Sequence, residues 1–294
     1  KNDYLWTNPD DSKGNIYKTG TVWARVNSRV ADTNTFTDQL ALTDKFNTGF
    51  LNHSFNLGAE YSDQETDRTQ YIIDSLSTTG TANSSCSASA IASGWCTSVQ
   101  NPNRGDWTGT ISTDGADRYN TQTKSTSIYL LDSIEFNPQW LLDLGIRWDK
   151  FDTEQTMIAG RYNSTYSEGT ITRAESDTDF INYQAGLTFK PVENGSIYAS
   201  FATSANPVGI DAGDGSEAIG ANYGNLDPEE SRTFELGTKW DLFNDRLNLT
   251  AAIFRTEKQN ARIQLDTTTY ANIGESKVDG LELGLNGKIT EKWD

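Results

Sequence analysis

Hydrophobic and polar residues alternate with a period of two in several well-separated segments of the chain. The clearest segment carries Leu142, Leu144, Ile146 and Trp148 at one parity and Asp143, Gly145, Arg147 and Asp149 at the other. The same alternation recurs over residues 54–61 and 181–190. Because successive side chains of a β-strand point to opposite faces, each segment is predicted to be a strand with one apolar and one polar face.

The alternating segments form pairs that are joined by short connections. These connections, at residues 45–49, 137–139, 191–195 and 244–245, contain the Asn, Asp, Gly or Pro that a tight reversal of the chain requires. They therefore predict hairpins. The strands number about ten, over residues 20–30, 34–46, 50–65, 124–137, 140–156, 178–190, 196–204, 231–243, 246–258 and 277–289.

The connections at the other ends of the hairpins are much longer, over residues 66–123, 157–177, 205–230 and 259–276. Connections of that length are unusual in compact soluble domains. Short turns at one rim and long loops at the other are typical of outer-membrane barrels. We therefore predict an all-β fold, an antiparallel transmembrane β-barrel with short periplasmic turns and long extracellular loops. The aromatic residues Trp140, Trp240, Phe243 and Trp293 lie close to the short turns, where an interfacial girdle is expected.

Composition and charge narrow the classes of function. Hydrophobic residues make up only 35% of the chain, which suits a barrel whose strands present half of their residues to a polar interior. No apolar run is long enough for a membrane helix. The formal net charge of −17 makes nucleic acid an unsuitable partner, because phosphate binding requires a basic surface. The chain opens without a signal peptide, so we expect a mature or internal segment of an exported protein.

The cysteine and histidine content argues against an enzyme or a resident metal centre. Cys86 and Cys96 lie in a Ser-, Ala- and Thr-rich stretch without a nearby histidine, so a disulfide in an oxidising compartment is predicted rather than a zinc site. His53 is the only histidine and cannot complete a catalytic triad; we expect it to make structural hydrogen bonds near the periplasmic rim. The acidic segment 211–217 is interpreted as a surface loop, and cation binding there is left open.

Two blocks of the second half resemble the TonB-dependent siderophore receptors. The first block runs from Leu226-Asp227-Pro228-Glu229 into Glu235-Leu236-Gly237-Thr238-Lys239-Trp240. The second, over residues 270–294, has Asn272, Gly274, Gly280 and Glu282 at the positions usual for the family. A weaker similarity covers residues 51–61. The resemblance is specific for the family and carries little information on the ligand.

The resemblance implies a 22-stranded barrel closed by an N-terminal plug domain. Residues 1–294 would then be part of the barrel domain, with about ten of its strands, while the plug, the energy-coupling segment and the last strands are not present in this chain. Small residues at the inward parity are expected to leave room for the plug. They are Gly58, Gly145, Gly186, Gly237 and Gly284.

The resemblance further implies a receptor in the bacterial outer membrane that binds a ferric siderophore, of the catecholate type, and imports it. The expected partners are the ferric siderophore, the TonB-ExbB-ExbD system, and outer-membrane lipid with lipopolysaccharide; iron enters as substrate, and no cofactor is expected. A ferric catecholate is anionic and aromatic, so its site should offer cationic and aromatic side chains. The loop candidates are Trp95, Arg104, Trp107, Arg118, Tyr119, Arg161, Tyr162, Tyr166 and Tyr223. Two alternatives are a passive pore or adhesin barrel without a plug, and a soluble β-protein that binds glycans.

Overall fold

A computed structural model of the chain consists of β-strands and their connections. It describes residues 2–10, 20–73, 96–102, 111–209, 226–244, 246–265 and 270–287. The strands are β1 (Asn2–Asp10), β2 (Thr21–Thr48), β3 (Leu51–Thr69), β4 (Ile72–Ile73), β5 (Cys96–Ser98), β6 (Ile111–Ser112), β7 (Arg118–Asn137), β8 (Trp140–Ile158), β9 (Ile171–Val192), β10 (Gly195–Asn206), β11 (Glu229–Leu242), β12 (Leu247–Gln264) and β13 (Tyr270–Gly287). Within these ranges there is no helix long and apolar enough to cross a membrane.

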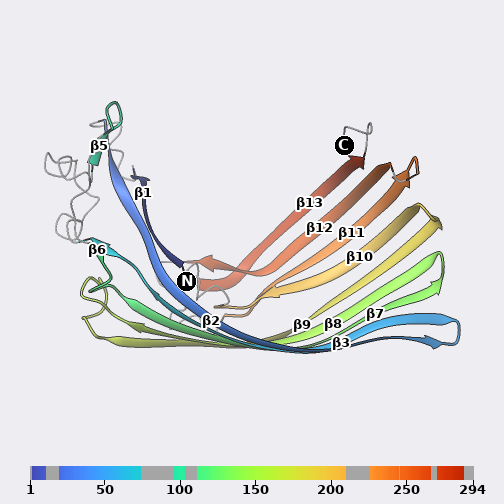
Figure 1. The fold of residues 1–294 in the computed structure, drawn as a ribbon, viewed down its shortest axis with the longest axis horizontal. Helices are drawn as coiled ribbons and strands as arrows, with labels where there is room; N and C mark the ends of the chain where they lie inside the picture. Colours follow the sequence, from blue (N-terminus) through green and yellow to red (C-terminus); the bar gives the residue numbers. More distant parts are fainter. Residues whose placement is uncertain are drawn as a thin grey trace. The chain divides into compact units, whose positions relative to one another are not determined.

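The long strands pair in the order of the sequence. The hydrogen-bonded order is β1-β2-β3-β7-β8-β9-β10-β11-β12-β13, and β5 pairs with the start of β2. Neighbours such as β10 and β11, or β12 and β13, are antiparallel and lie side by side (Figure 1). This up-and-down order confirms the predicted antiparallel sheet and each of the predicted hairpins.

The number of long strands agrees with the prediction, but two of the assignments at the N-terminal end were wrong. Residues 20–30 and 34–46 belong to one strand, β2, and β1 was not predicted. The polar run around Asn34 suggested a break. In the structure this run stays in the sheet, where the hydroxyl groups of Thr33 and Thr66 are hydrogen-bonded across β2 and β3 (3.1 Å).

Several strands extend into the segments that were predicted to be long loops. β9 already begins at Ile171, β12 continues to Gln264, and β13 begins at Tyr270. These extensions carry polar residues on both faces; Arg262, for example, pairs with Asn272 across β12 and β13. A strand that is polar on both faces has no period-two signal, which explains why the loops were predicted too long.

The chain divides into two compact units. The first comprises Lys1–Asn34, Glu65–Thr121 and Gln155–Arg173, and the second comprises Thr35–Gln64, Gln122–Glu154 and Ala174–Asp294. In the second unit the apolar parity is exposed, with Leu281, Leu283 and Leu285 at 66%, 74% and 72%. On the opposite parity the carboxylate of Asp149 is buried. Exposed apolar and enclosed polar side chains are the distribution expected of a barrel wall in a membrane.

His53 makes the structural hydrogen bonds that were predicted for it. Its ring nitrogens lie 2.7 Å from the Thr48 hydroxyl and 2.7 Å from the Asp132 carboxylate, and the ring is stacked on Phe46 at 4.6 Å. All four residues lie near the short turn between β2 and β3. Their contacts join β2, β3 and β7 at this end of the sheet.

Aromatic residues gather near the other short turns of the second unit as well. Trp140 packs against Phe189 with ring centroids 4.6 Å apart, and Phe243 is 74% exposed. Trp240 covers Gly195 on the facing strand. Trp293 lies outside the described residues. The described members therefore fit the predicted aromatic girdle.

Candidate functional site

Five of the predicted ligand-binding residues lie in described parts of the first unit. They are Arg118, Tyr119, Arg161, Tyr162 and Tyr166. The other candidates, Trp95, Arg104, Trp107 and Tyr223, lie outside the described residues, as do Cys86 and the acidic segment 211–217. Cys96 is fully buried and is not a free thiol; its pairing with Cys86 stays a prediction.

Tyr119, at the start of β7, lies beneath the guanidinium of Arg68, a residue that the sequence analysis did not identify as a candidate. The guanidinium of Arg68, near the end of β3, is 4.2 Å from the centroid of the Tyr119 ring. Both residues belong to the polar, inward parity of their strands. In the part of β7 that belongs to the first unit, burial and the nearby Asp117 carboxylate raise the pKa of Tyr119, while Arg68 opposes them. The tyrosine is therefore neutral at physiological pH and presents an aromatic face with a fixed positive partner.

A second cation–aromatic pair lies in the connection between β8 and β9. The Arg161 guanidinium is 4.9 Å from the centroid of the Tyr162 ring and 3.5 Å from the Asp114 carboxylate. Gly115 permits this approach: it has a φ of +79°, and a Cβ there would lie 2.5 Å from Nε of Arg161. Arg161 and Tyr162 are exposed, so they can meet a ligand from solvent.

Asp117 ties the segment around Gly115 to the β8–β9 connection. Its carboxylate accepts hydrogen bonds from the Gly160 amide (2.8 Å) and from the Asn163 side chain (3.0 Å). The Asn163 side chain in turn accepts a bond from the Tyr166 amide (2.7 Å). Tyr166 is thereby held by its backbone and leaves its ring 44% exposed. Arg118 is exposed at the start of β7.

The first unit thus supplies two Arg–Tyr pairs on one part of the molecule, each with a carboxylate nearby. Arginine and tyrosine together suit an anionic aromatic ligand, since arginine provides charge and fixed donors and the ring provides a stacking face. Among the described residues no group of three or more His, Cys, Asp or Glu side chains could hold a metal ion.

The inward face of the second unit carries an ion-pair network that sequence reasoning missed. The Arg147 guanidinium on β8 donates to Glu60 on β3 (2.7 Å) and to Asp149 (2.8 Å), and Asp149 also accepts from Ser127 (2.6 Å). The amide of Gln39 bridges Glu60 (2.8 Å) and the hydroxyl of Tyr129 (3.0 Å).

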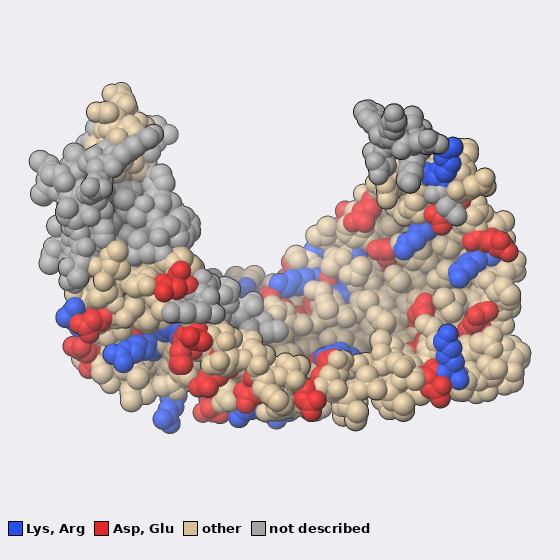
Figure 2. Space-filling model, in the orientation of Figure 1, with Lys and Arg blue, Asp and Glu red and all other residues tan. Residues whose placement is uncertain are grey.

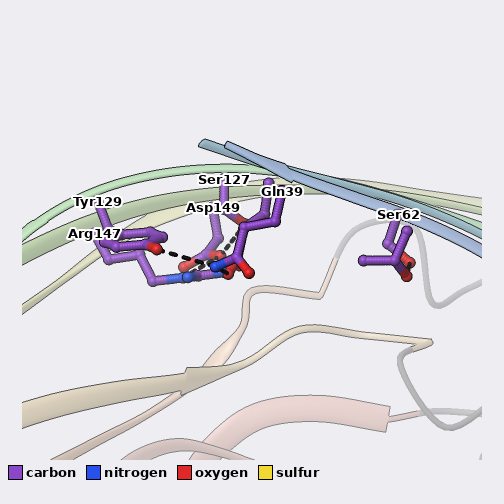
Figure 3. Close-up of polar contacts among 8 residues, drawn as sticks. Gln39, Ser62, Ser127, Tyr129, Arg147 and Asp149 are labelled. Atoms are coloured by element: carbon purple, nitrogen blue, oxygen red, sulfur yellow. Dashed lines mark hydrogen bonds and ion pairs between the residues drawn. The ribbon is translucent and has the colours of Figure 1, made fainter. Parts of the chain in front are cut away.

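Figure 3 shows that Tyr129, Arg147, Asp149 and Gln39 point toward one another, with Ser62 apart from them. The shared parity of Arg147 and Asp149 on β8 was visible in the sequence. Their partners on other strands depend on register, which no single strand reveals.

Four of the five inward glycines do not leave open space, which corrects that expectation; they are Gly58, Gly145, Gly237 and Gly284. A Cβ at Gly58 would lie 2.2 Å from the Tyr129 ring, and one at Gly237 would lie 2.5 Å from the Tyr198 ring. Tyr198 is directly opposite Gly237 in the register of β10 and β11, and its hydroxyl donates to Glu235 (2.6 Å). Aromatic rings laid across glycines on neighbouring strands cover the exposed backbone of the sheet. Gly58 and Gly237 therefore serve packing within the wall.

The inward face also contains a cavity of about 1020 Å³ in the second unit. Its lining includes Lys45, Ser54, Asp143, Gln184 and Ser200, which come from five strands. The apolar side chains of Phe55, Leu131, Leu144 and Phe201 also line it, so the cavity does not favour one class of ligand. On the face drawn in Figure 2, acidic and basic side chains are interspersed, and the described residues show no continuous basic patch there.

Comparison with known families and proteins gives consistent results. The family described as TonB dependent receptor-like, beta-barrel, matches residues 1–294. The probable TonB-dependent siderophore receptor PiuA of Acinetobacter baumannii is 56% identical over 297 residues, which cover 100% of this chain and 39% of PiuA. The probable TonB-dependent receptor BfrD of Bordetella pertussis is 32% identical over 292 residues, which cover 97% of this chain and 37% of BfrD.

Solved structures agree with the sequence comparisons. The crystal structure of PiuA matches 98% of this chain and 40% of the PiuA chain with a TM-score of 0.87. The closed form of the ferric-catecholate import receptor Fiu of Escherichia coli K12 matches 98% of this chain and 41% of its own chain, with a TM-score of 0.76 and 25% identity. The chain therefore spans about two fifths of the length of these relatives.

Proposed function

Because the chain belongs to the TonB-dependent receptor family and matches its β-barrel along residues 1–294, we propose that it forms part of the wall of a receptor that imports ferric siderophores. The receptor binds a ferric siderophore of the catecholate class at its long connections and delivers it to the periplasm. The TonB-ExbB-ExbD system supplies the energy through a part of the receptor outside residues 1–294. Members of the family are outer-membrane β-barrels, and this chain is an outer-membrane protein.

The similarity to PiuA, which extends over the whole chain at 56% identity, is the observation that carries the proposal. The similarity to the catecholate siderophore receptor Fiu, 29% identical over 318 residues, supports the choice of catecholates. Family members are transporters, so the reaction is capture and import without covalent chemistry. Iron enters as part of the substrate, and no resident cofactor is proposed.

The two Arg–Tyr pairs of the first unit support this choice of ligand. Arg68 with Tyr119, and Arg161 with Tyr162, offer positive charge beside an aromatic face. A tris-catecholate complex of ferric iron presents negative charge and aromatic rings at its surface, so both features are used at once. We propose that these four residues contact the ligand, together with the predicted loop residues Trp95, Arg104, Trp107, Arg118, Tyr166 and Tyr223.

The proposal is tested by titrating the purified full-length receptor in detergent with a ferric tris-catecholate siderophore and with its iron-free form. Tryptophan fluorescence reports binding. We expect saturable sub-micromolar quenching by the ferric form, weakened about tenfold when Arg68 or Arg161 is replaced by Gln, because each change removes one charge-assisted contact. Arg246→Gln, at the short turn between β11 and β12, is the matched control and should bind as the unmodified receptor does.

Two outcomes would count against the proposal. No quenching by any ferric catecholate would overturn the catecholate class. If Arg246→Gln weakens binding as much as Arg68→Gln or Arg161→Gln does, the Arg–Tyr pairs are not part of the ligand-binding site. The proposed receptor function would not be affected by that result.

A further inference from the structure

β12 contains a bulge near the end that leads to the β12–β13 connection. Its pairing with β13 is regular from Leu247 to Lys258, and the register then shifts between Lys258 and Ala261 and again between Ala261 and Arg262. Asn260 lies in this bulge and has a φ of +54°, in the left-handed region that asparagine tolerates better than most residues. The backbone groups of the bulge lie outside the regular ladder, so they need partners from elsewhere.

The side-chain amide of Asn272, near the start of β13, supplies one of these partners. Its nitrogen donates to the Asn260 carbonyl (2.7 Å) and to the Asp227 carbonyl (3.0 Å), and its oxygen accepts from the Asp227 amide (2.9 Å). The two bonds with Asp227 resemble the exchange of N–H and C=O between paired residues of an antiparallel ladder. Asn272 thereby joins three segments, which are the connection before β11, the β12 bulge and β13.

Glu229, the first residue of β11, holds the same bulge from the other neighbouring strand. Its carboxylate accepts from the Arg262 backbone amide (2.8 Å) and lies 2.8 Å from the Lys258 ammonium and 3.6 Å from the Arg262 guanidinium. The side chains of Glu229 and Arg262 are only 11% and 12% exposed, and ion pairs that are this enclosed are screened less than surface pairs. The residues on both sides of Asn260 are thus bound to the start of β11.

Gly274 permits β13 to approach the bulge closely. It is paired with Ala261, and a Cβ at position 274 would lie 2.8 Å from the Ala261 Cβ and 2.8 Å from the Ala261 carbonyl oxygen. A larger residue would therefore push the two strands apart. Asn272 lies two residues earlier on β13, so this close approach helps to bring its amide within reach of Asn260.

The two sequence blocks that resemble the receptor family meet at these contacts. Asp227 and Glu229 belong to the first block, and Asn272 and Gly274 belong to the second. Asp227 and Asn272 are 45 residues apart in the sequence. We call Asp227, Glu229, Asn260 and Asn272 the Asn272 cluster.

The Asn272 cluster lies where the β10–β11 connection enters the sheet. Tyr223, which is proposed above as a ligand contact, precedes Asp227 by four residues in this connection. Four residues span at most about 14 Å, even when fully extended. A fixed Asp227 therefore limits the positions that Tyr223 can reach.

We propose that Asn272 is a positioning residue for ferric siderophore binding, a role that rests on the proposed function. It fixes the end of the β10–β11 connection to the β12 bulge, so that ligand contacts on this connection are held in place before the ligand arrives. A ligand that must first order a loose connection loses part of its binding free energy to conformational entropy. The affinity for the ferric siderophore therefore depends on Asn272 without direct contact between the two.

The test replaces Asn272 with Asp in the full-length receptor in detergent. The size of the side chain is kept, but a carboxylate oxygen now faces the carbonyls of Asp227 and Asn260 and cannot donate to them. The control is Asn286→Asp, the same change at an exposed position near the other end of β13. By tryptophan quenching, the affinity for a ferric tris-catecholate siderophore should fall about tenfold for Asn272→Asp and stay unchanged for Asn286→Asp.

Two further measurements separate positioning from general loss of structure. Limited proteolysis should cleave the β10–β11 connection faster in Asn272→Asp than in Asn286→Asp, without faster cleavage elsewhere in the barrel domain. Asn260→Gly should keep the affinity, because glycine adopts a positive φ readily and retains the carbonyl that Asn272 binds. Asn260→Val should lower the affinity as Asn272→Asp does, because a β-branched residue disfavours a positive φ.

Equal siderophore affinities of Asn272→Asp and Asn286→Asp would overturn the proposal, as would equal cleavage of the β10–β11 connection in the two variants. Faster cleavage throughout the barrel domain would show that Asn272 only maintains the fold, which also overturns the positioning role. If the unmodified receptor binds no ferric catecholate, the proposed function fails instead. The cleavage comparison would then still decide whether Asn272 holds the connection.

Discussion

Replacing Arg147 with Met removes the centre of the inward ion-pair network and tests whether this network holds the wall together. Asp149 would keep only the Ser127 hydroxyl as a partner, in a position where its side chain is 7% exposed. Glu60, at 31% exposure, can be hydrated and keeps its bond to Gln39. The cost therefore falls mainly on Asp149.

The expected loss in the free energy of unfolding is about 2 kcal/mol. Breaking a fully buried ion pair costs about 3–5 kcal/mol. The Arg147 side chain is 36% exposed, so water already screens part of the interaction and the cost is smaller. A hydrogen bond to a charged group contributes about 1.5–3 kcal/mol, which gives the same scale.

The assay is urea unfolding of the full-length receptor in micelles, followed by tryptophan fluorescence. Lys150→Met is the matched control, because Lys150 lies three residues along the same strand on the outward face and its ion pairs are exposed; it should cost less than about 1 kcal/mol. Adding Asp149→Asn to Arg147→Met should cost less than the sum of the two single changes, since the unpaired charge is gone. Equal losses for Arg147→Met and Lys150→Met would refute the reasoning.

Three further predictions concern single positions. Gly237→Ala should lower the free energy of unfolding, measured in urea, by about 1–3 kcal/mol, because the new Cβ would displace the Tyr198 ring. The control Gly186→Ala, whose Cβ would lie 3.8 Å from Asp143, should cost less than half as much. A larger loss for Gly186→Ala would contradict the packing role of Gly237. His53→Leu should lose about 1–2 kcal/mol in the same assay by leaving Asp132 without its partner, and an unchanged midpoint would show that the Thr48–His53–Asp132 contacts add nothing. Asp117→Ala should loosen the β8–β9 connection, because it removes the hydrogen bonds to Gly160 and Asn163. Limited proteolysis should then cleave near residue 163 faster than in a Glu168→Ala control. Equal cleavage rates would show that Asp117 does not hold this connection in place.

The membrane-spanning parts of the fold could be predicted well because each of their strands has one apolar face. The segment 142–149 alternates without exception, and β8 occupies it. Period two disappears where both faces meet water or polar neighbours. For that reason a break was wrongly predicted near Asn34, within β2. For the same reason β9, β12 and β13 were predicted too short.

The candidate site could be predicted only as a set of residue types. Tyr119, Arg161 and Tyr162 were predicted as aromatic and cationic loop residues that contact the ligand, which stays a prediction; the structure places Tyr119 in β7 and gives each of the three a cation–aromatic partner. Arg68 was missed because it is distant from Tyr119 in sequence and meets it only through the pairing of β3 with β7. The contacts of Arg147 were missed for the same reason. Cross-strand contacts depend on register, and register is set jointly by the turns and by the packing of all strands.

The most direct test of ferric siderophore import is uptake of radioactive iron by cells whose only catecholate receptor is the full-length protein containing this chain. Iron supplied as a ferric catecholate should accumulate in cells with an intact TonB system and should remain at background in cells without TonB. Uptake that continues without TonB would contradict energised import and indicate a passive pore. Absence of uptake in the intact cells, with the receptor present in the outer membrane, would contradict the catecholate assignment.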